Sequence, residues 1–483
     1  MVKRAAPLAA LWLGACASVP PHSAEPQPIG TAAVASARSL ESAAGADWPA
    51  EGWWARYGDP QLDALIAEGL RNAPDVAAAD ARFRRAGALA QQVGAASQPR
   101  VDVTGQVQEQ KQSLNLGYPP EFQSNLPRGW NDGGQVAAQA GFDLHLWGRN
   151  RAVLAAATSE LQAARIDARQ ARLTLAVGIA SAYFDLDRLG AERETRVREL
   201  ASADSSRKLL AQRQANGLET RGSVATAAAQ AATARGALNQ IEELLILRRH
   251  QIAALIGAGP DRGLAVTRPM LSAMSARELP ADVTTELVSR RPDVAAARAR
   301  VDAASSRIKV ARAEFYPAIR LSALLGFQSL GLETLFHGAS SFGQVGPAFA
   351  LPLFRGGELR GRYRGARADY DAAVASYDGA VLNAYRETAD AVTAVTMTAQ
   401  RLADARAAMV ASQDAFAVAS ARYRGGLFSY LDVLQVEDRL LASQLAHAAA
   451  EAAVRNADLA LVRALGGGFS SAAAANPKEA PYG

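Results

Sequence analysis

The sequence predicts a mainly α-helical, internally duplicated protein with four β-strands and long coiled helical hairpins. Three observations predict this fold class. A short motif recurs in the second half of the chain, segments of alternating polarity stand in both halves, and two long stretches contain no proline. The recurring motif aligns the two halves, and the two halves of a duplicated chain are expected to form the same elements.

The hexapeptide Pro74–Ala79 recurs letter for letter as Pro292–Ala297, an offset of 292 − 74 = 218 residues. We therefore expect two repeats, at 59–259 and 260–466. Each repeat should open with a helix in which proline occupies the first turn, where its missing N–H costs nothing. These helices are expected at about 74–96 and 292–314.

Residues of alternating polarity follow each of these helices. Valines at 101, 103 and 107 alternate with Asp102, Thr104 and Gln106, which is the period-two pattern of a strand with one polar face. The pattern recurs at 135–146, 319–327 and 345–353, so β-hairpins are expected at about 101–146 and 317–353. A strand of about 10 residues is long enough to cross a bilayer when tilted.

Two long helical hairpins are expected after the strands, at about 148–257 and 355–465. No proline occurs from 128 to 259 or from 353 to 476, and both stretches are rich in the strong helix formers Ala, Arg, Leu and Glu. A single break interrupts each stretch: Asn216-Gly217 with Gly222 in the first, and Gly425-Gly426 in the second. The first helix should reach roughly 100 Å, and its alanines suit a coiled-coil-like wall.

The amino terminus has the pattern of a secretory signal. Lys3 and Arg4 precede an apolar run that is too short to remain as a membrane helix, so residues 1–15 should be removed. The run ends in Leu13–Cys16, and small residues before a cysteine resemble the bacterial lipobox. Because Cys16 is the only cysteine in the chain, it has no partner for an internal disulfide. We expect it to carry covalent lipid, a diacylglycerol and an N-acyl chain.

A lipidated tether at 16–58 and a polar, disordered tail at 467–483 are expected to flank the repeats. Residue 17 is alanine rather than aspartate. The resemblance to bacterial lipoproteins therefore implies a lipid-anchored protein of the outer membrane, with an extension into the periplasm.

Composition argues against several other classes. No segment after the signal approaches ~18 uninterrupted apolar residues, which argues against a helical inner-membrane protein. The net charge of +5 is spread among mixed signs, so nucleic acid is not an expected partner. The five histidines lack metal spacing, and neither a Gly-rich phosphate loop nor a Gly-x-Ser-x-Gly elbow occurs. We therefore expect no metal, no cofactor and no enzymatic activity.

Four strands are too few to close a sheet in hydrocarbon. An unpaired backbone N–H or C=O there costs several kcal/mol, and the small single-chain barrels have about eight strands. Copies of the chain would complete a barrel of eight, twelve or sixteen strands, with a wet lumen lined by Asp102, Gln106, Gln139 and Asp143. The alternative is a soluble amphipathic sheet that rests on the helices.

Three segments share their sequence with one family. Trp53–Asp75 holds Trp-Trp, Tyr-Gly-Asp-Pro-Gln-Leu and Asn-Ala-Pro-Asp; Arg290–Pro317 holds Arg-Arg-Pro-Asp-Val and Ala-Glu-Phe-Tyr-Pro. The third, Arg422–Leu434, reads Arg-Tyr-Arg-Gly-Gly-Leu-Phe-Ser-Tyr-Leu-Asp-Val-Leu. In this order they resemble the TolC-like outer-membrane factors, specifically the NodT-type efflux lipoproteins, from Trp53 to Gly466.

The resemblance implies a homotrimer, with a 12-stranded transmembrane β-barrel in the outer membrane and a 12-helix α-barrel in the periplasm. It implies a passive exit duct of a tripartite efflux system, of the kind that confers multidrug resistance. The duct would dock on a periplasmic adaptor, also called a membrane fusion protein, and an inner-membrane pump. Two alternatives stay open: the outer-membrane duct of a type I protein secretion system, and a periplasmic helical adaptor without a pore.

The resemblance also implies a constriction at the periplasmic tip, formed by Arg422, Tyr423 and a ring of Leu431. Relatives carry an acidic residue one turn beyond this leucine, where this chain has Gln435, so Asp432 is the nearest source of an acidic ring. Both helical turns are expected at this tip, with the residues Gly217, Leu218, Gly425, Gly426 and Leu427.

Overall fold

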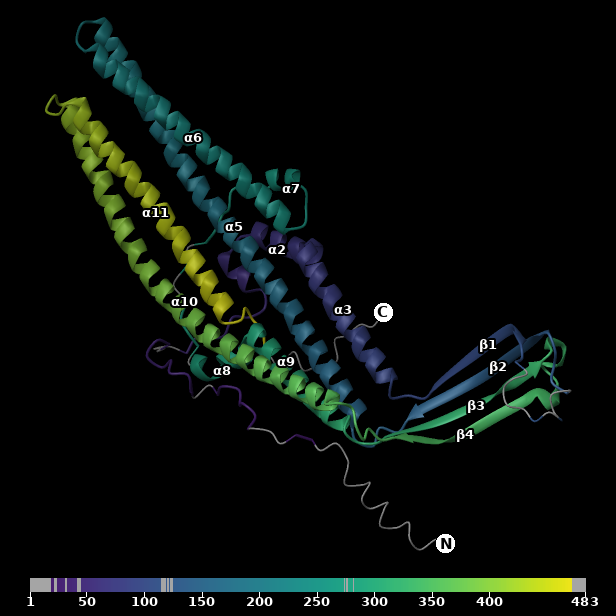
Figure 1. Ribbon diagram of the computed structural model, residues 1–483. Helices are drawn as coiled ribbons and strands as arrows, with labels where there is room; N and C mark the ends of the chain where they lie inside the picture. Colours follow the sequence, from purple (N-terminus) through teal and green to yellow (C-terminus); the bar gives the residue numbers. More distant parts are fainter. Residues whose placement is uncertain are drawn as a thin grey trace. The chain divides into compact units, whose positions relative to one another are not determined.

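The computed structural model (Figure 1) describes most of the chain, in two compact units. The first unit contains Arg84–Gln162 and Ala299–Ala375, and the second contains Pro28–Phe83, Ala163–Arg298 and the chain from Ser376. Cys16 and its signal lie outside the described residues, as does the tail from 471. The described residues are 19–20, 24–30, 33–40, 45–113, 119, 121, 125–272, 274, 277–280 and 282–470.

The helices come in matched pairs, one from each half of the chain. The equal pairs have 22, 67 and 35 residues, and they are α3 (Pro74–Ala95) with α9 (Pro292–Ala313), α5 (Arg149–Ala215) with α10 (Glu358–Arg424), and α6 (Arg221–Leu255) with α11 (Tyr430–Ala464). This confirms the predicted long helical hairpins. Shorter elements complete the helical part: η2 (Trp53–Tyr57), α2 (Pro60–Asn72), α7 (Pro260–Leu264) and α8 (Val283–Arg290).

One predicted break differs from the structure. Gly222, expected as part of the interruption between the first two long helices, lies inside α6. The reason is the cap at Thr220, whose Oγ1 accepts a hydrogen bond from Ser223 N at 3.1 Å. A threonine N-cap fixes where the helix begins, so α6 starts at Arg221 and the following glycine is absorbed into its first turn.

The strands form one antiparallel sheet in the order β1-β2-β3-β4, which confirms the two predicted hairpins. The strands are β1 (Arg100–Lys111), β2 (Trp130–Asp143), β3 (Ala318–Leu330) and β4 (Ser341–Ala350). Among the described strands, β1 and β4 each have one neighbour. Two rows of backbone N–H and C=O groups are therefore unpaired in a single protomer.

The register places the apolar and polar residues on opposite faces. Directly paired residues share a face, and one such row is Val101, Ala140, Ala323 and Val345. A row on the other face is Gln106, Gln135 and Gln328, and the row of Asp102, Gln139 and Gln344 departs from polarity only at Leu324. On the apolar face Val345 and Phe349 are 78% and 83% exposed, so this face is open in the protomer.

Aromatic residues at the start of the first repeat build a core in the second unit. Trp54, Trp53, Tyr57 and Phe184 form a chain of edge-to-face ring contacts, with centroids 5.4, 6.3 and 4.7 Å apart. The Tyr57 hydroxyl donates to Asp458 Oδ2 at 2.8 Å, and Arg277 Nε lies 2.9 Å from Asp458 Oδ1. Burial raises the pKa of the Tyr57 phenol. The segment therefore fastens η2 to α11.

Asp59, two residues further along the same motif, connects α2 to α5. Asp59 is 5% exposed and caps α2 by accepting from Gln61 N at 2.9 Å. Its other carboxylate oxygen accepts from the Tyr183 hydroxyl at 2.6 Å and from Met270 N at 2.8 Å. The three donors, Gln61 N, the Tyr183 hydroxyl and Met270 N, satisfy the buried carboxylate of Asp59. The aspartate of the Tyr-Gly-Asp-Pro-Gln-Leu sequence therefore has a structural role.

The helix α6 packs through a heptad seam. Six of its seven buried residues are spaced by three, four or seven positions, the seam spacing of a left-handed coiled coil. These six are Ala227, Ala231, Ala234, Ile241, Leu245 and Ile252, and the seventh is Ala253. The small residues lie toward the start of α6 and the large ones toward its end. Close helix packing is thus expected where alanine lines the seam.

The described parts of the predicted tether are held by protein contacts. In the first unit Glu25 lies 3.3 Å from Arg367. In the second unit Ile29 N donates to Asp378 Oδ1 at 2.8 Å, and Trp48 Nε1 donates to Asp282 Oδ1 at 3.0 Å. This proline-rich segment therefore packs on the helices that it passes.

Among the residues that the structure describes, no helix has both the length and the apolarity required to cross a membrane.

We predict that Asp458→Ala destabilises the protein by about 3–5 kcal/mol, because it leaves the buried Arg277 without its carboxylate. The two side chains are 13% and 4% exposed. Chemical unfolding of the purified protein measures the change. Glu451→Ala on the same helix is the matched control, since its side chain is 44% exposed. Equal stability of the two variants would contradict the role given to the pair.

Candidate functional site

Side-chain contacts in the second unit order the four long helices as α6, α5, α11 and α10. Two ion pairs join α5 to α6: Arg193 with Glu242 at 2.9 Å, and Asp204 with Arg235 at 3.5 Å. A second seam joins α5 to α11, through Asp187 and Arg455 at 2.9 Å. Arg291 holds α10 and α11 together, as described below. The two outer helices of this row are therefore α6 and α10.

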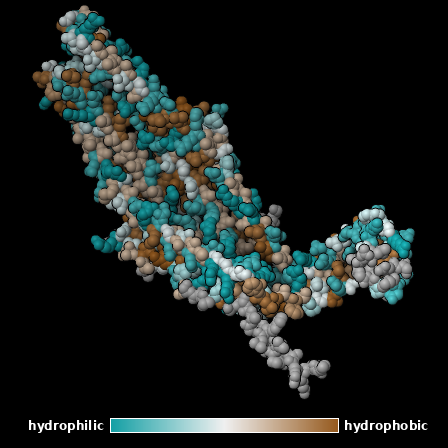
Figure 2. Space-filling model, viewed as in Figure 1, coloured by the Kyte–Doolittle hydropathy of each residue, from teal (hydrophilic) through white to brown (hydrophobic). Residues whose placement is uncertain are grey.

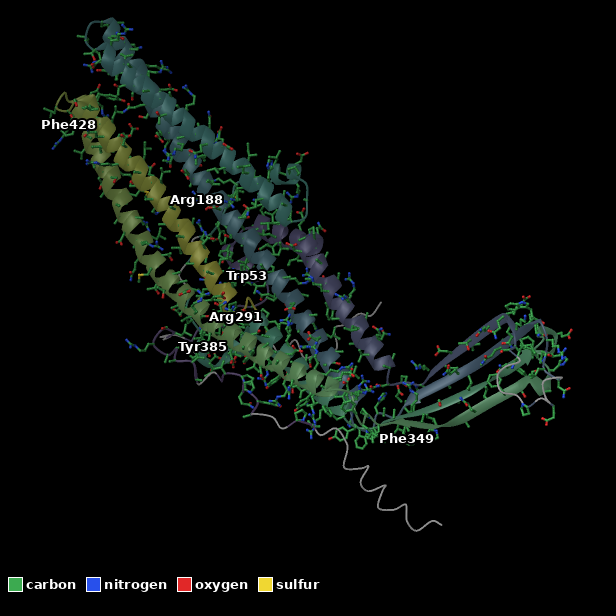
Figure 3. The ribbon with its side chains drawn as sticks, in the orientation of Figure 1. Trp53, Arg188, Arg291, Phe349, Tyr385 and Phe428 are labelled. Atoms are coloured by element: carbon green, nitrogen blue, oxygen red, sulfur yellow. The ribbon has the colours of Figure 1, made fainter. Side chains whose placement is uncertain are left out.

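Arg291, labelled in Figure 3, belongs to the Arg-Arg-Pro-Asp motif and is 5% exposed. Its guanidinium donates to Glu387 Oε2 on α10 at 2.7 Å and to the carbonyl of Ala464, the last residue of α11, at 3.1 Å. Asp293 accepts two further hydrogen bonds from it. Hydrogen bonds to these carboxylates raise the pKa of Arg291 against the opposing effect of burial. The motif thus fixes the ends of two helices.

The two turns at the far ends of the long helices have the same backbone geometry. Leu218 N donates to Arg213 O at 2.9 Å, and Leu427 N donates to Arg422 O at 2.9 Å. The preceding glycines, Gly217 and Gly426, have positive φ angles of 73° and 74°. Each turn is a Schellman motif, in which glycine adopts the left-handed conformation that ends a helix.

The two turns do not end at the same level. The hydroxyl of Tyr430, the first residue of α11, contacts Ser206 of α5. From Ser206 the helix α5 continues for 215 − 206 = 9 residues, which adds about 14 Å before the turn at Gly217. The turn with Gly217 and Leu218 therefore extends beyond the start of α11.

Asp432 has a defined structural role in the second turn. Ser429 caps α11, and its backbone N donates to Asp432 Oδ2 at 2.9 Å while Asp432 N donates to Ser429 Oγ at 3.3 Å. These reciprocal bonds form a capping box. The hydrogen bonds from Ser429 lower the pKa of the Asp432 carboxyl, so this carboxylate is ionised and committed to its own helix end.

Arg422 and Tyr423 lie in the last turn of α10, and each contacts an aromatic ring beyond the end of the helix. The Arg422 guanidinium lies 5.2 Å from the centroid of the Phe428 ring, and the Tyr423 and Tyr430 rings are 5.4 Å apart. Phe428 lies at the α10–α11 turn in Figure 3. Each of these two predicted residues therefore contacts an aromatic side chain across the turn: Phe428 from the loop and Tyr430 from the start of α11.

Leucines project from the turns into solvent. Leu431 is 60% exposed in the protomer, and Leu218 and Leu427 are 67% and 79% exposed. Figure 2 shows hydrophobic residues gathered at the surface of the α10–α11 turn. Exposed apolar residues that gather in a patch can serve as an interaction surface, so the α10–α11 turn, with Leu427 and Leu431, offers an apolar contact.

Sequence reasoning passed over three residues of this region: Ser206, Phe428 and Tyr430. Phe428 and Tyr430 lie inside the Arg422–Leu434 segment, and aromatic residues beside a helix end could have indicated that they pack against Arg422 and Tyr423. Ser206 gave none, because a serine in a 67-residue helix is unremarkable until its partner on another helix is known. Gln435 is exposed, and the next acidic residue, Glu437, is half-buried beside α5, where burial raises the pKa of its carboxyl.

Over the described ranges, no cluster of three or more His, Cys, Asp and Glu side chains has the geometry to hold a metal ion.

Relatives of known name match between three quarters and nearly all of the chain. It is 30% identical to the multidrug resistance outer membrane protein MdtP of Escherichia coli K12, over 95% of this chain and 94% of the relative. It is 36% identical to the fusaric acid resistance protein FusA of Burkholderia cepacia over 74% of this chain and 68% of the relative. The pyoverdine export outer membrane protein OpmQ of Pseudomonas aeruginosa is 29% identical, with 96% of both chains covered.

Solved structures have the same fold. The outer membrane protein VceC of Vibrio cholerae is 39% identical and superimposes with a TM-score of 0.80, over 88% of this chain and all of the other. The outer-membrane channel OprN is 28% identical with a TM-score of 0.79, over 94% and 99% of the two chains. The family described as outer membrane efflux protein matches residues 65–258 and 283–467, in both halves of the chain. Its members are channel proteins rather than enzymes, and this chain belongs to the outer membrane efflux protein family.

Proposed function

We propose that the protein is the passive exit duct of a tripartite efflux system, built from three copies of the chain. Membership of the efflux family gives the outer membrane as its compartment and efflux as its class of transport. One observation carries the proposal: over the part of the chain that the structure describes, the sheet has an open apolar face and two open edges. Lipid would cover the face, and strands of other copies would pair with the edges.

Strand direction favours closure by identical copies. The four strands alternate in direction, so β4 of one copy runs antiparallel to β1 of the next. Two copies would give eight strands, whose interior is only about wide enough for side chains. Three copies are the smallest assembly with an aqueous lumen, and the glutamine rows of the polar face would line it.

Like the sheet, the row of four long helices has an exposed surface on each outer element. Its outer helices carry exposed apolar residues: Leu244 and Leu247 on α6, and Leu382, Met397, Val410 and Val418 on α10, each between 39% and 53% exposed. Packing α6 of one copy against α10 of the next would bury both sets. Twelve long helices from three copies would then surround a common lumen.

Energy and substrate selection must come from partners, because a duct has no site for either. We propose a periplasmic adaptor that docks on the turns, where Leu218 and Leu427 are exposed, and an inner-membrane pump behind it. The relatives are named for fusaric acid resistance, multidrug resistance and pyoverdine export. Small organic molecules are accordingly the proposed cargo.

The proposed constriction is formed by Arg422, Tyr423, Leu431 and Asp432. In a threefold assembly each side chain near the axis occurs three times at one height, so one exposed leucine becomes an apolar ring. The capping box keeps Asp432 at the helix end, and three such carboxylates would place negative charge beside the leucines. Arg422 and Tyr423 would hold this turn in shape.

We predict that the mature protein begins at Cys16 and carries lipid there. Several acyl chains anchor a protein far more firmly than one. Mass spectrometry of the protein purified from membranes measures the amino-terminal mass, and Cys16→Ser serves as the unlipidated control. An intact Met1, or an unmodified Cys16 thiol, would show that this prediction is wrong.

We predict that cysteines on β1 and β4 crosslink different chains. Asp102→Cys should be combined in turn with Gln344→Cys, Gly346→Cys and Ala348→Cys, in a Cys16→Ser background without other cysteines. Oxidation should yield dimers and trimers on denaturing gels. The matched control is Gln139→Cys with Leu324→Cys, which are paired within one sheet and should give intrachain bonds. Only monomers from every β1–β4 combination would count against the assembly.

We predict that Leu431→Ala with Tyr423→Phe increases single-channel conductance and resting leak in planar bilayers. Replacing three isobutyl side chains by methyl groups widens an apolar ring from which water is otherwise excluded. Leu218→Ala is the control, since it removes an equally exposed leucine from the other turn. Unchanged conductance in a folded double variant would move the constriction elsewhere.

A further inference from the structure

Polar side chains join α5 to α11 along much of their length. Besides Asp187 with Arg455, Ser181 Oγ donates to Asn456 Oδ1 at 3.2 Å, and Arg198 donates to Gln444 Oε1 at 3.0 Å. The contact nearest the α10–α11 turn is that of Tyr430 with Ser206. These contacts connect the first helical hairpin to the second within one chain.

The direction of the Tyr430 hydrogen bond follows from its surroundings. Ser206 is 2% exposed, and its Oγ donates its single hydrogen to the carbonyl of Ser202 at 2.8 Å. Ser206 Oγ is therefore the acceptor and the Tyr430 hydroxyl is the donor. The bond ties the first residue of α11 to the backbone of α5 through a buried hydroxyl.

The same tyrosine also contacts the end of α10. Its ring lies 5.4 Å from the ring of Tyr423, and it immediately precedes Leu431 and Asp432 in the chain. Tyr430 thus touches the two helices of its own hairpin and one helix of the other. Its displacement would move the proposed constriction with it.

Two turns beyond Tyr430 along α11, the burial of Glu437 opposes close packing of α11 on α5. Burial raises the pKa of the Glu437 carboxyl, the Ser202 hydroxyl lowers it by donating a hydrogen bond, and the charges of Asp438 and Glu199 add to the rise. An ionised carboxylate loses hydration there and regains it if α11 moves away from α5. Closure near the tip therefore depends on favourable contacts such as the bond from Tyr430.

We propose that Tyr430 is a positioning residue for the resting tip: its hydrogen bond to Ser206 holds the start of α11 against α5 and keeps the Leu431 ring narrow. This role rests on the proposed duct. A hydrogen bond of ordinary strength shifts an equilibrium about 5-fold. If three copies open together, its loss shifts the closed-to-open equilibrium roughly 100-fold.

The test compares Tyr430→Phe, Ser206→Ala and the double variant in the full-length protein, reconstituted in planar bilayers. Phenylalanine keeps the ring contact with Tyr423 and removes only the donor. Each single variant should raise the open probability at rest by up to roughly 100-fold. The double variant should have the same open probability as Tyr430→Phe, because both single variants and the double variant lack the same hydrogen bond. Such non-additivity is the signature of a direct interaction.

Tyr385→Phe is the matched control. The Tyr385 hydroxyl donates to Thr284 O at 2.7 Å, and the residue lies on α10, labelled in Figure 3. This variant should leave the open probability unchanged. Melting temperatures of all the assemblies separate a looser tip from a general loss of stability, because the tip variants should melt with the parent.

Two results overturn the role of Tyr430: an unchanged open probability in Tyr430→Phe, or a double variant that leaks by the product of the two single effects. If Leu431→Ala and the parent protein conduct while Tyr430→Phe equals the parent, the duct stands and only this inference fails. If neither the parent nor any variant conducts, the proposed duct fails and this role fails with it.

Discussion

The unpaired edges of the four-stranded sheet are the constraint on which the remaining structure depends. β1 and β4 each pair on one side among the described strands, and the apolar face between them carries Val345 and Phe349 almost fully exposed. In water such a surface favours aggregation, and in lipid each open N–H or C=O costs several kcal/mol. Pairing between copies removes both penalties, and the alternating strand directions permit it without any rearrangement. Under the proposed function, the protein meets this constraint by assembly with copies of itself.

In the helical part, side-chain contacts rather than backbone hydrogen bonds join neighbouring elements. Its helices are ordered by ion pairs and hydrogen bonds between neighbours, from Arg193 with Glu242 to Tyr430 with Ser206. The motif residues Tyr57, Asp59 and Arg291 are buried and hydrogen-bonded, so they hold helix ends at fixed positions. The turns are held by local contacts such as the capping box of Ser429 with Asp432, while their leucines are exposed and α5 extends past the start of α11. A wall fixed between helices and a tip held by a few local contacts are what a duct needs if its tip is to open while its wall stays closed.

Much of this architecture could be predicted from the sequence because it rests on periodicity. Alternation of Val101, Val103 and Val107 with polar residues gave the strands and their faces, and the two proline-free stretches gave the long helices. Local capping was harder: Thr220 starts α6 and absorbs Gly222, and Ser429 pairs with Asp432, which the resemblance alone presented as part of a gate. Contacts between helices, such as that of Ser206 with Tyr430, have no sequence signal, since they depend on the register of two helices more than 200 residues apart. The contacts of the tether were likewise hidden, because proline-rich composition resembles that of a free linker.

Hydrogen exchange of the backbone amides in the lipid-embedded assembly tests the central claim most directly. Amides exchange slowly when they are hydrogen-bonded in a stable structure and rapidly when they face water unpaired. Pairing between copies predicts that the outward amides of β1 and β4 are protected to the same degree as those of β2 and β3. Rapid exchange along β1 and β4, with protection confined to β2 and β3, would mean that the edges stay open and would contradict the account.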